Sequence, residues 1–180
     1  MIILKTKRLI LRTWEEQDID PMSAIDQDPA VCEYFPEIGN RIATKAMIQR
    51  FINHYEKYGF SFYAVELNSN SEFIGFVGLQ YPSFEAHFTS AVEIGWRLAS
   101  KHWGKGYASE AAQAVLNFAF TTLNLEEVVS FTTENNTRSR RVMEKIGMHH
   151  NPHDDFYHPK LSKDSPLCRH VLYRLTRESK

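Results

Sequence analysis

The stretch from residue 91 to 133 constrains the fold more than any other part of the sequence. Ala91–Leu98 alternates apolar side chains with polar or small ones, which is the period of a half-buried strand. Ala108–Leu123 then repeats apolar side chains at helical spacing, and Glu127–Thr133 is rich in β-branched residues. A strand, a helix and a second strand in this order predict a parallel pair joined by a right-handed crossover.

The remaining segments predict antiparallel strands and further helices. Ser61–Leu67 and Glu72–Gln80 have the period of strands and are separated by a turn-rich tetrapeptide, so they predict a hairpin. Further strands are expected at 8–12 and 169–176, and further helices at 18–25, 44–57 and 136–146. The expected fold class is therefore mixed α/β (α+β), with a mostly antiparallel sheet flanked by helices.

The composition excludes several classes of protein. Hydrophobic residues make up 43% of the 180 residues and aromatic residues 13%, which is enough for a large core and excludes a disordered or fibrous chain. We expect residues 1–180 to form one domain. The formal charge of −1 indicates no overall attraction to nucleic acid or to an anionic membrane.

The compartment is predicted from the cysteines and from the apolar runs. Cys32 and Cys168 lie far apart in sequence, which is typical of reduced thiols in a cytoplasmic protein. The start of the chain lacks the pattern of a secretory signal. The uncharged stretch Ala111–Leu125 is interrupted by polar residues and cannot span a bilayer, so no membrane partner is expected.

The segment Lys101–Ala108, between a strand and a helix, is the best candidate for a binding site. Gly104 and Gly106 allow a sharp turn and a close approach to a ligand, and the following helix offers unpaired N–H groups. The loop therefore predicts a phosphate or pyrophosphate site, although a tight turn without a ligand is the alternative. The spacing fits neither a P-loop nor a dinucleotide fingerprint, which would need a glycine where Ser109 stands.

Several motifs, taken in order, resemble the GNAT acetyltransferases, above all the branch typified by the Rim ribosomal-protein acetyltransferases. Residues 93–99 and 103–111 resemble motif A, and residues 135–148 resemble motif B. Residues 7–12 and 73–79 resemble two strands of the branch. The resemblance implies splayed central parallel strands that admit the cofactor. It further implies an N-acetyltransferase that uses acetyl-CoA as co-substrate, needs no metal, and acetylates a primary amine of a protein N-terminus or small molecule.

The same resemblance assigns residues to the cofactor. It implies that the pyrophosphate of acetyl-CoA is surrounded by Trp103, Gly104, Lys105, Gly106, Tyr107, Ala108 and Ser109. It implies that the pantetheine arm pairs with the backbone of Trp96, Arg97 and Leu98, and that Asn136 contacts the cofactor. Lys101 takes a place that is usually Gln or Arg. Gly95 is a candidate for a bulge that splays the strands.

Two residues are candidates for catalysis. Glu93 is the expected general base, and an ordinary solvent-facing strand glutamate is the alternative. The usual tyrosine acid of motif B is replaced by Met143, so Ser139 is the candidate acid, with helix capping as its alternative role. The oxyanion is expected to meet a backbone N–H near Ile94 or Gly95. Because of Met143, a non-catalytic acyl-CoA-binding module or sensor stays the alternative function.

Three further groups have open interpretations. Arg138, Arg140, Arg141 and Lys145 fit either the 3′-phosphate and adenine end of CoA or a solvated helix face. The histidine-rich segment His149–His158 suggests a metal site, but a polar loop is favoured because prolines interrupt it. Its Asp154, Asp155, Tyr157 and His158 are candidates to hold a cationic amine. Phe60, Phe62 and Tyr63 are expected in the core, and the protein is expected to be a monomer or homodimer.

Overall fold

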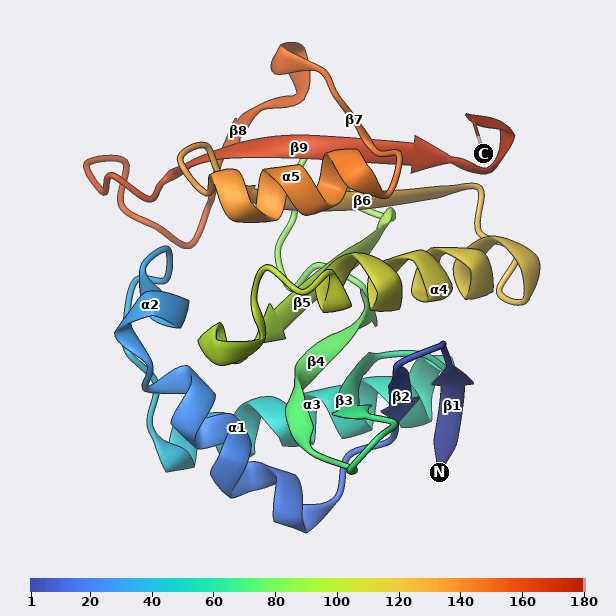
Figure 1. Ribbon diagram of the computed structural model, residues 1–180. Helices are drawn as coiled ribbons and strands as arrows, with labels where there is room; N and C mark the ends of the chain where they lie inside the picture. The colour runs from blue at the N-terminus through green and yellow to red at the C-terminus, as the bar shows by residue number, and fades with distance from the viewer. Residues whose placement is uncertain (180) are drawn as a thin grey trace.

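The computed structural model describes residues 1–179 and shows one mixed sheet with helices on both faces (Figure 1). Within those residues the sheet has nine strands in the order β1-β2-β3-β4-β5-β6-β9-β7, and β8 also pairs with β9. The pair β5–β6 is parallel, and the other pairs are antiparallel. The strands are β1 (Ile2–Lys5), β2 (Leu9–Arg12), β3 (Phe62–Leu67), β4 (Phe73–Gln80), β5 (Val92–Leu98), β6 (Glu127–Thr133), β7 (His149–His150), β8 (Phe156–Tyr157) and β9 (Arg169–Thr176). The predicted mixed α/β class is confirmed.

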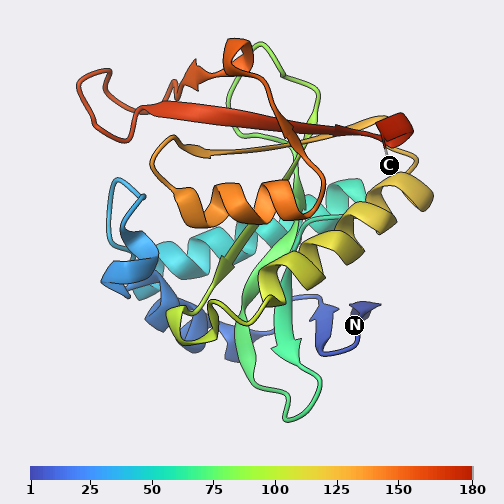
Figure 2. The same ribbon diagram turned by 45° about the horizontal axis from the view of Figure 1, so that its top comes forward.

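The helices divide between the two faces of the sheet (Figure 2). They are α1 (Ile19–Asp26), α2 (Pro29–Cys32), α3 (Arg41–Tyr58), α4 (Tyr107–Thr121) and α5 (Thr137–Lys145), with short 3-10 turns at Glu16–Asp18, Ser100–His102, Pro152–Asp154 and Arg177–Ser179. In α3 the side chain of Asn40 caps the N-terminus, and Gly59 ends the helix at φ 77°, where glycine is favoured. None of the helices within residues 1–179 is long and apolar enough to cross a membrane.

Two apolar clusters hold the helices against the sheet. Helix α4 packs its small residues, such as Ala111 and Ala112, against strands of one face, and Met143 of α5 lies in the same cluster. Helices α1 and α3 pack against the other face. Phe60, Phe62 and Tyr63 are all buried, as the sequence predicts.

The parallel strands β5 and β6 separate soon after they meet. They pair only at Val92 with Val128 and at Glu93 with Val129, after which β5 continues along β4 and β6 continues along β9. The bulge predicted at Gly95 is absent from the β4–β5 pairing, which runs in unbroken register through that residue. The splay arises instead because each strand follows its antiparallel neighbour. This parting opens the centre of the sheet.

Candidate active site

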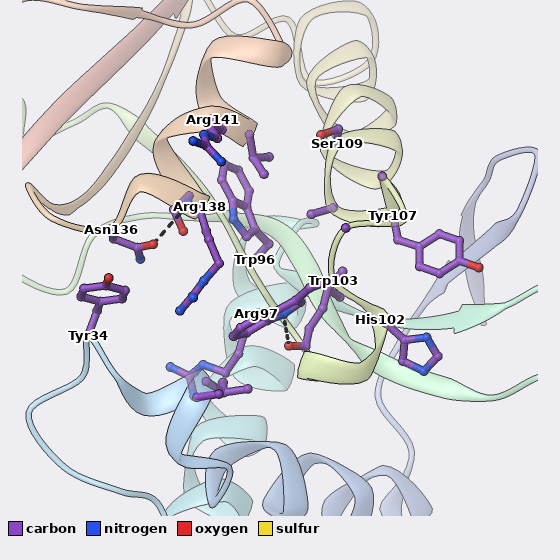
Figure 3. A pocket seen from close by; sticks show the side chains of 18 of the residues that line it. Tyr34, Trp96, Arg97, His102, Trp103, Tyr107, Ser109, Asn136, Arg138 and Arg141 are labelled. Atoms are coloured by element: carbon purple, nitrogen blue, oxygen red, sulfur yellow. Dashed lines mark hydrogen bonds between the residues drawn. The ribbon is translucent and has the colours of Figure 1, made fainter.

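A cavity of about 330 Å³ lies at the parting of β5 and β6, between the start of α4, the helix α5 and the short helix α2 (Figure 3). All of the predicted cofactor residues except Lys105 line it: Trp96, Arg97, Leu98, Trp103, Gly104, Gly106, Tyr107, Ala108, Ser109 and Asn136. Ser139 lines it as well, whereas Glu93 lies outside the lining residues. The structure therefore gathers the predicted residues of motif A and motif B around one space.

The glycine loop leaves the N-terminus of α4 open toward this cavity. Gly104 and Gly106 have φ of 73° and 80°, a region that residues with side chains rarely adopt. Gly106 is the N-cap of α4, and no side chain caps the helix there. Because the first turn of a helix has N–H groups without intrahelical partners, the lining residues Tyr107, Ala108 and Ser109 offer donors to an anion.

Neither lysine of this segment, Lys101 or Lys105, lines the cavity. Lys101 Nζ lies 2.6 Å from Glu72 Oε1, and Lys101 does not line the cavity. Hydrogen bonds from Lys101 and His102 lower the pKa of Glu72 to about 2. Lys105 is also outside the cavity lining. The cationic side chains that do line the cavity are Arg97, Arg138, Arg141 and Lys145.

The side chain of Arg97 is held by contacts with other parts of the protein. Its Nη1 lies 2.6 Å from Asp26 Oδ1, and Thr44 Oγ1 donates to the other oxygen of the same carboxylate at 2.6 Å. The guanidinium also lies 4.1 Å from the centre of the Phe35 ring. Arg97 thus connects β5 to α1 and to the segment that follows α2.

The backbone N–H and C=O groups of successive β5 residues point alternately toward β4 and toward β6. The hydrogen bond from Ala99 N–H to the Ile74 carbonyl shows which residues face β4. Since backbone groups alternate along an antiparallel pair, those of Glu93, Gly95 and Arg97 also face β4. The backbone groups on the opposite edge, toward the parting, are those of Ile94, Trp96 and Leu98.

Two hydrogen bonds agree with this alternation. The Ile94 carbonyl accepts from Ser130 Oγ of β6 at 2.9 Å, and the Leu98 carbonyl accepts from Trp103 Nε1 at 2.8 Å. Of the two N–H groups predicted near the oxyanion, that of Gly95 faces β4 and that of Ile94 faces β6, with which β5 still pairs at Glu93 and Val129. An extended ligand in the parting would meet the backbone of Trp96 and Leu98 but not that of Arg97.

Glu93 lies on the face of β5 opposite Val92 and Ile94, where the strands begin to part. Burial raises the pKa of its carboxyl to about 8. Among residues 1–179 its side chain has no hydrogen bond or ion pair that would oppose this shift. A Cβ atom at Gly95 would lie 3.6 Å from Glu93 Oε1, so the absence of a side chain there leaves room beside the carboxyl. Glu93 is half-buried, which differs from a fully solvent-facing strand glutamate.

The start of α5 distinguishes the roles of Asn136 and Ser139. Asn136 Oδ1 accepts from the Ser139 N–H at 3.2 Å, and Asn136 Nδ2 donates to Thr132 Oγ1 at 3.0 Å. Asn136 is therefore the cap of α5, and the capping role considered for Ser139 is wrong. The Ser139 side chain lines the cavity and has no hydrogen bond within the described residues. Met143 is 1% exposed in the core, so its position offers nothing to the cavity.

The α2 wall of the cavity escaped the sequence analysis. Ala30, Val31, Tyr34 and Phe35 line it. The signal for this wall is the pair Asp28–Pro29, because Asp28 caps α2 by accepting from Ala30 N–H and proline favours the first helical position.

Arg138 of α5 joins this wall to the opposite side of the cavity. Its Nη2 lies 2.6 Å from Glu33 Oε2, and its guanidinium lies 4.4 Å from the centre of the Trp103 ring and 5.8 Å from that of Tyr34. Figure 3 shows Arg138 between these two rings. Of the predicted basic run, Arg140 instead donates to Tyr173 Oη and to the Glu134 carbonyl and is absent from the cavity lining.

The histidine-rich segment already has partners for its carboxylates. Asp154 Oδ2 lies 2.8 Å from Arg174 Nε, and Asp155 Oδ1 lies 2.7 Å from His150 Nε2. His158 packs against Phe84, with ring centres 4.5 Å apart. Within residues 1–179, no group of three or more His, Cys, Asp or Glu side chains is arranged to hold a metal ion. The two carboxylates are therefore engaged within the fold rather than free to hold an amine.

Known relatives share most of this chain. Residues 8–149 match the family described as acetyltransferase (GNAT) domain. The uncharacterized N-acetyltransferase YnaD of Bacillus subtilis is 34% identical over 145 residues, which cover 81% of each chain. The uncharacterized protein YkkB of the same organism is 32% identical over 148 residues, which cover 82% of this chain and 85% of the relative.

Solved structures show the same fold. A GNAT-family acetyltransferase from Bacillus anthracis has a TM-score of 0.80 at 28% identity, over 99% of both chains. A RimL ribosomal L7/L12 alpha-N-protein acetyltransferase in complex with coenzyme A has a TM-score of 0.78 over 100% of both chains, and at 15% identity this likeness concerns the fold alone. Since the family match spans most of the sequence, this protein belongs to the GNAT acetyltransferases, enzymes whose general reaction is the acetylation of an amine by acetyl-CoA.

Proposed function

We propose that this enzyme binds acetyl-CoA in the cavity between α4 and α5 and transfers the acetyl group to a primary amine. The amine belongs to a protein N-terminus or to a small molecule. The observation that carries this proposal is Glu93, a carboxyl without a partner among residues 1–179 and with a pKa of about 8, at the point where β5 and β6 separate. A base with a pKa near the working pH is suited to proton transfer.

The residues around the cavity fit the two ends of the co-substrate. The open N-terminus of α4 and the backbone of the loop from Gly104 to Ser109 fit its pyrophosphate. The edge of β5 with the N–H groups of Trp96 and Leu98 fits the amides of the pantetheine arm, as an added strand would. Arg141 and Lys145 line the cavity on α5 and fit the 3′-phosphate end.

The chemistry then follows from the groups beside the parting. Glu93 accepts a proton from the ammonium group of the acceptor, directly or through water, and the neutral amine attacks the thioester carbonyl. As the new C–N bond forms and the C–S bond breaks, the hydroxyl of Ser139 donates a proton to the departing thiolate. Ser139 recovers a proton from the attacking nitrogen, directly or through water, so that the amide product is neutral.

The alternative, an acyl-CoA-binding module without turnover, rests on Met143. That side chain is buried and stands where many family members place a tyrosine acid. The hydroxyl of Ser139, which has no hydrogen bond to the part of the chain that the structure describes, favours turnover instead. Thiolate is also a fair leaving group, so a weak acid suffices.

The test is the release of free thiol from acetyl-CoA by the purified protein, with and without primary amines. The amines include an N-terminal peptide and small diamines, and mass spectrometry identifies the acetylated product. We expect thiol release that depends on an amine and matches the acetylated product in amount. Binding of acetyl-CoA without any amine-dependent thiol would support the binding module and contradict the proposal.

We also propose that residues 1–180 act as one domain in the cytoplasm. A single sheet that combines strands from Ile2 to Thr176 supports one domain. Cys32 and Cys168 are both buried and unpaired, which supports a reducing compartment. The choice between monomer and homodimer, and the absence of a nucleic-acid partner, stay predictions.

A further inference from the structure

Arg8, on the turn between β1 and β2, contacts the glycine loop from outside the cavity. Its Nη1 donates to the Lys105 carbonyl at 2.9 Å, although the two residues are 97 positions apart in sequence. Its guanidinium lies 4.5 Å from the centre of the Tyr107 ring, which Figure 3 shows directed away from the cavity. One side chain of the first hairpin thus contacts two successive parts of the loop.

The β1–β2 turn is also hydrogen-bonded to Glu110 at the start of α4. Glu110 Oε2 accepts from Arg8 Nε at 2.6 Å, and Glu110 Oε1 accepts from the Arg8 N–H at 2.9 Å and from Thr6 Oγ1 at 2.6 Å. Although partial burial opposes it, these hydrogen bonds hold the pKa of Glu110 below its ordinary value. Helix α4 is therefore fixed to the hairpin at the end where an anion is expected.

The bond to the Lys105 carbonyl sets the direction of the next N–H group. In a planar trans peptide the C=O and the following N–H point to opposite sides. Because the Lys105 carbonyl points outward to Arg8, the N–H of Gly106 points inward, and Gly106 lines the cavity. Arg8 thus acts on the peptide plane that carries one of the loop's inward donors.

The space outside Gly106 is also closed by Arg8. A Cβ atom at Gly106 would lie 3.4 Å from Arg8 Nη2, and the residue has φ of 80°. Arg8 itself does not line the cavity, and its charge is matched by Glu110. Its effect on a ligand therefore passes through the loop rather than through direct contact.

We propose that Arg8 is a positioning residue, which holds the Lys105–Gly106 peptide and the start of α4 so that the loop's N–H groups converge on the pyrophosphate of acetyl-CoA. This inference rests on the proposed function. Thr6 and Glu110 complete the arrangement, which we call the hairpin clamp. Without it the loop has to be ordered by the ligand, and that ordering reduces affinity.

The experiment compares Arg8→Ala and Arg8→Lys with wild type by calorimetric titration of acetyl-CoA and by initial rates. Arg8→Ala is expected to raise the Kd and the KM of acetyl-CoA about tenfold, as loss of one charge-assisted contact does. The kcat and the acceptor KM should stay within about twofold of wild type, because the contacts of Arg8 are with the loop and with α4 and not with Glu93. Arg8→Lys should fall between the two, since one ammonium cannot reach both Lys105 and Glu110.

The control is Arg41→Ala, which removes an exposed ion pair with Asp20 outside the cavity lining and should leave both KM values unchanged. The Gly106 amide resonance should shift in Arg8→Ala before any ligand is added. A lowered melting temperature with unchanged Kd in both Arg8 variants would make Arg8 a structural anchor only and would overturn the inference. If Arg8→Ala fails to fold, the Kd and the melting temperature of Arg8→Lys test the inference in the same way. Wild type that fails to bind acetyl-CoA would instead refute the proposed function.

Discussion

Two glutamates within one strand–loop–helix unit have opposite environments. Glu93, at the start of β5, has no partner among the described residues, and burial raises its pKa to about 8. Glu110, in the first turn of α4, accepts three hydrogen bonds from the β1–β2 turn, and its pKa lies below the ordinary value. The same side chain therefore serves as a titrating group at one end of the unit and as a permanent anion at the other.

The difference shows how the fold assigns chemistry to a residue type. A carboxyl that is desolvated without compensation holds its proton near neutral pH, whereas donors fix the charged form. Groups of the first kind concentrate at catalytic sites, and groups of the second kind hold elements together. Substitutions of the two glutamates separate these two roles.

Glu93→Gln is expected to lower kcat by about 10² to 10⁴, the range that general-base catalysis supplies. The amide keeps the size of the side chain but cannot accept the ammonium proton. Initial rates with a saturating amine give kcat, and calorimetry gives the Kd of acetyl-CoA, which should remain within about twofold. Activity close to wild type would remove Glu93 from the mechanism.

The pH dependence should show the same base. Below its pKa of about 8 the Glu93 carboxyl is protonated and cannot accept a proton, so kcat/KM should rise with pH and level off above that value. Between pH 6 and pH 8 the expected rise is about fiftyfold, because the carboxylate fraction grows from about 1% to about half. A strongly basic amine, protonated across this range, keeps the ionisation state of the acceptor constant and retains the step in which Glu93 accepts the ammonium proton. A flat profile with this amine would contradict the assignment.

Glu110→Gln should have the smallest effect. The amide keeps one acceptor oxygen but loses the charge that Arg8 meets, so we expect a loss of about 1 kcal/mol in the free energy of unfolding. The Kd of acetyl-CoA should rise only a few-fold, because Arg8 still reaches the Lys105 carbonyl. Urea unfolding at pH 7 measures the first quantity. A change in kcat comparable to that of Glu93→Gln would show that the two roles are not separate.

Local patterns predict the loop and its flanking elements well. Gly104 and Gly106 both have the positive φ that their place in a tight turn suggests, and Glu127–Thr133 is a strand with the predicted bounds. These features depend on neighbours in sequence. The resemblance to a family, rather than spacing, gave the roles of Glu93 and Ser139, which stay proposals.

The parts that the sequence did not predict depend on distant partners. Lys101 turns away from the loop because Glu72, 29 positions earlier, accepts its charge. Helix α2 has four residues, too few for a helical period, and Arg138 reaches its end from 105 positions away. The strand β1 is equally short and was missed although its turn carries Arg8. Contacts of this kind appear only once the chain is folded.

The most direct test of the account is a carbon-13 NMR titration of the glutamate carboxyl groups, with Glu93→Gln to assign the Glu93 signal. We expect one inflection near pH 8 that disappears in the variant, far above the ordinary value of 4.5. We also expect that Glu110, assigned with Glu110→Gln, stays charged to a pH below that value. An inflection for Glu93 near 4.5 would contradict the claim that the fold holds a base ready at the parting of β5 and β6.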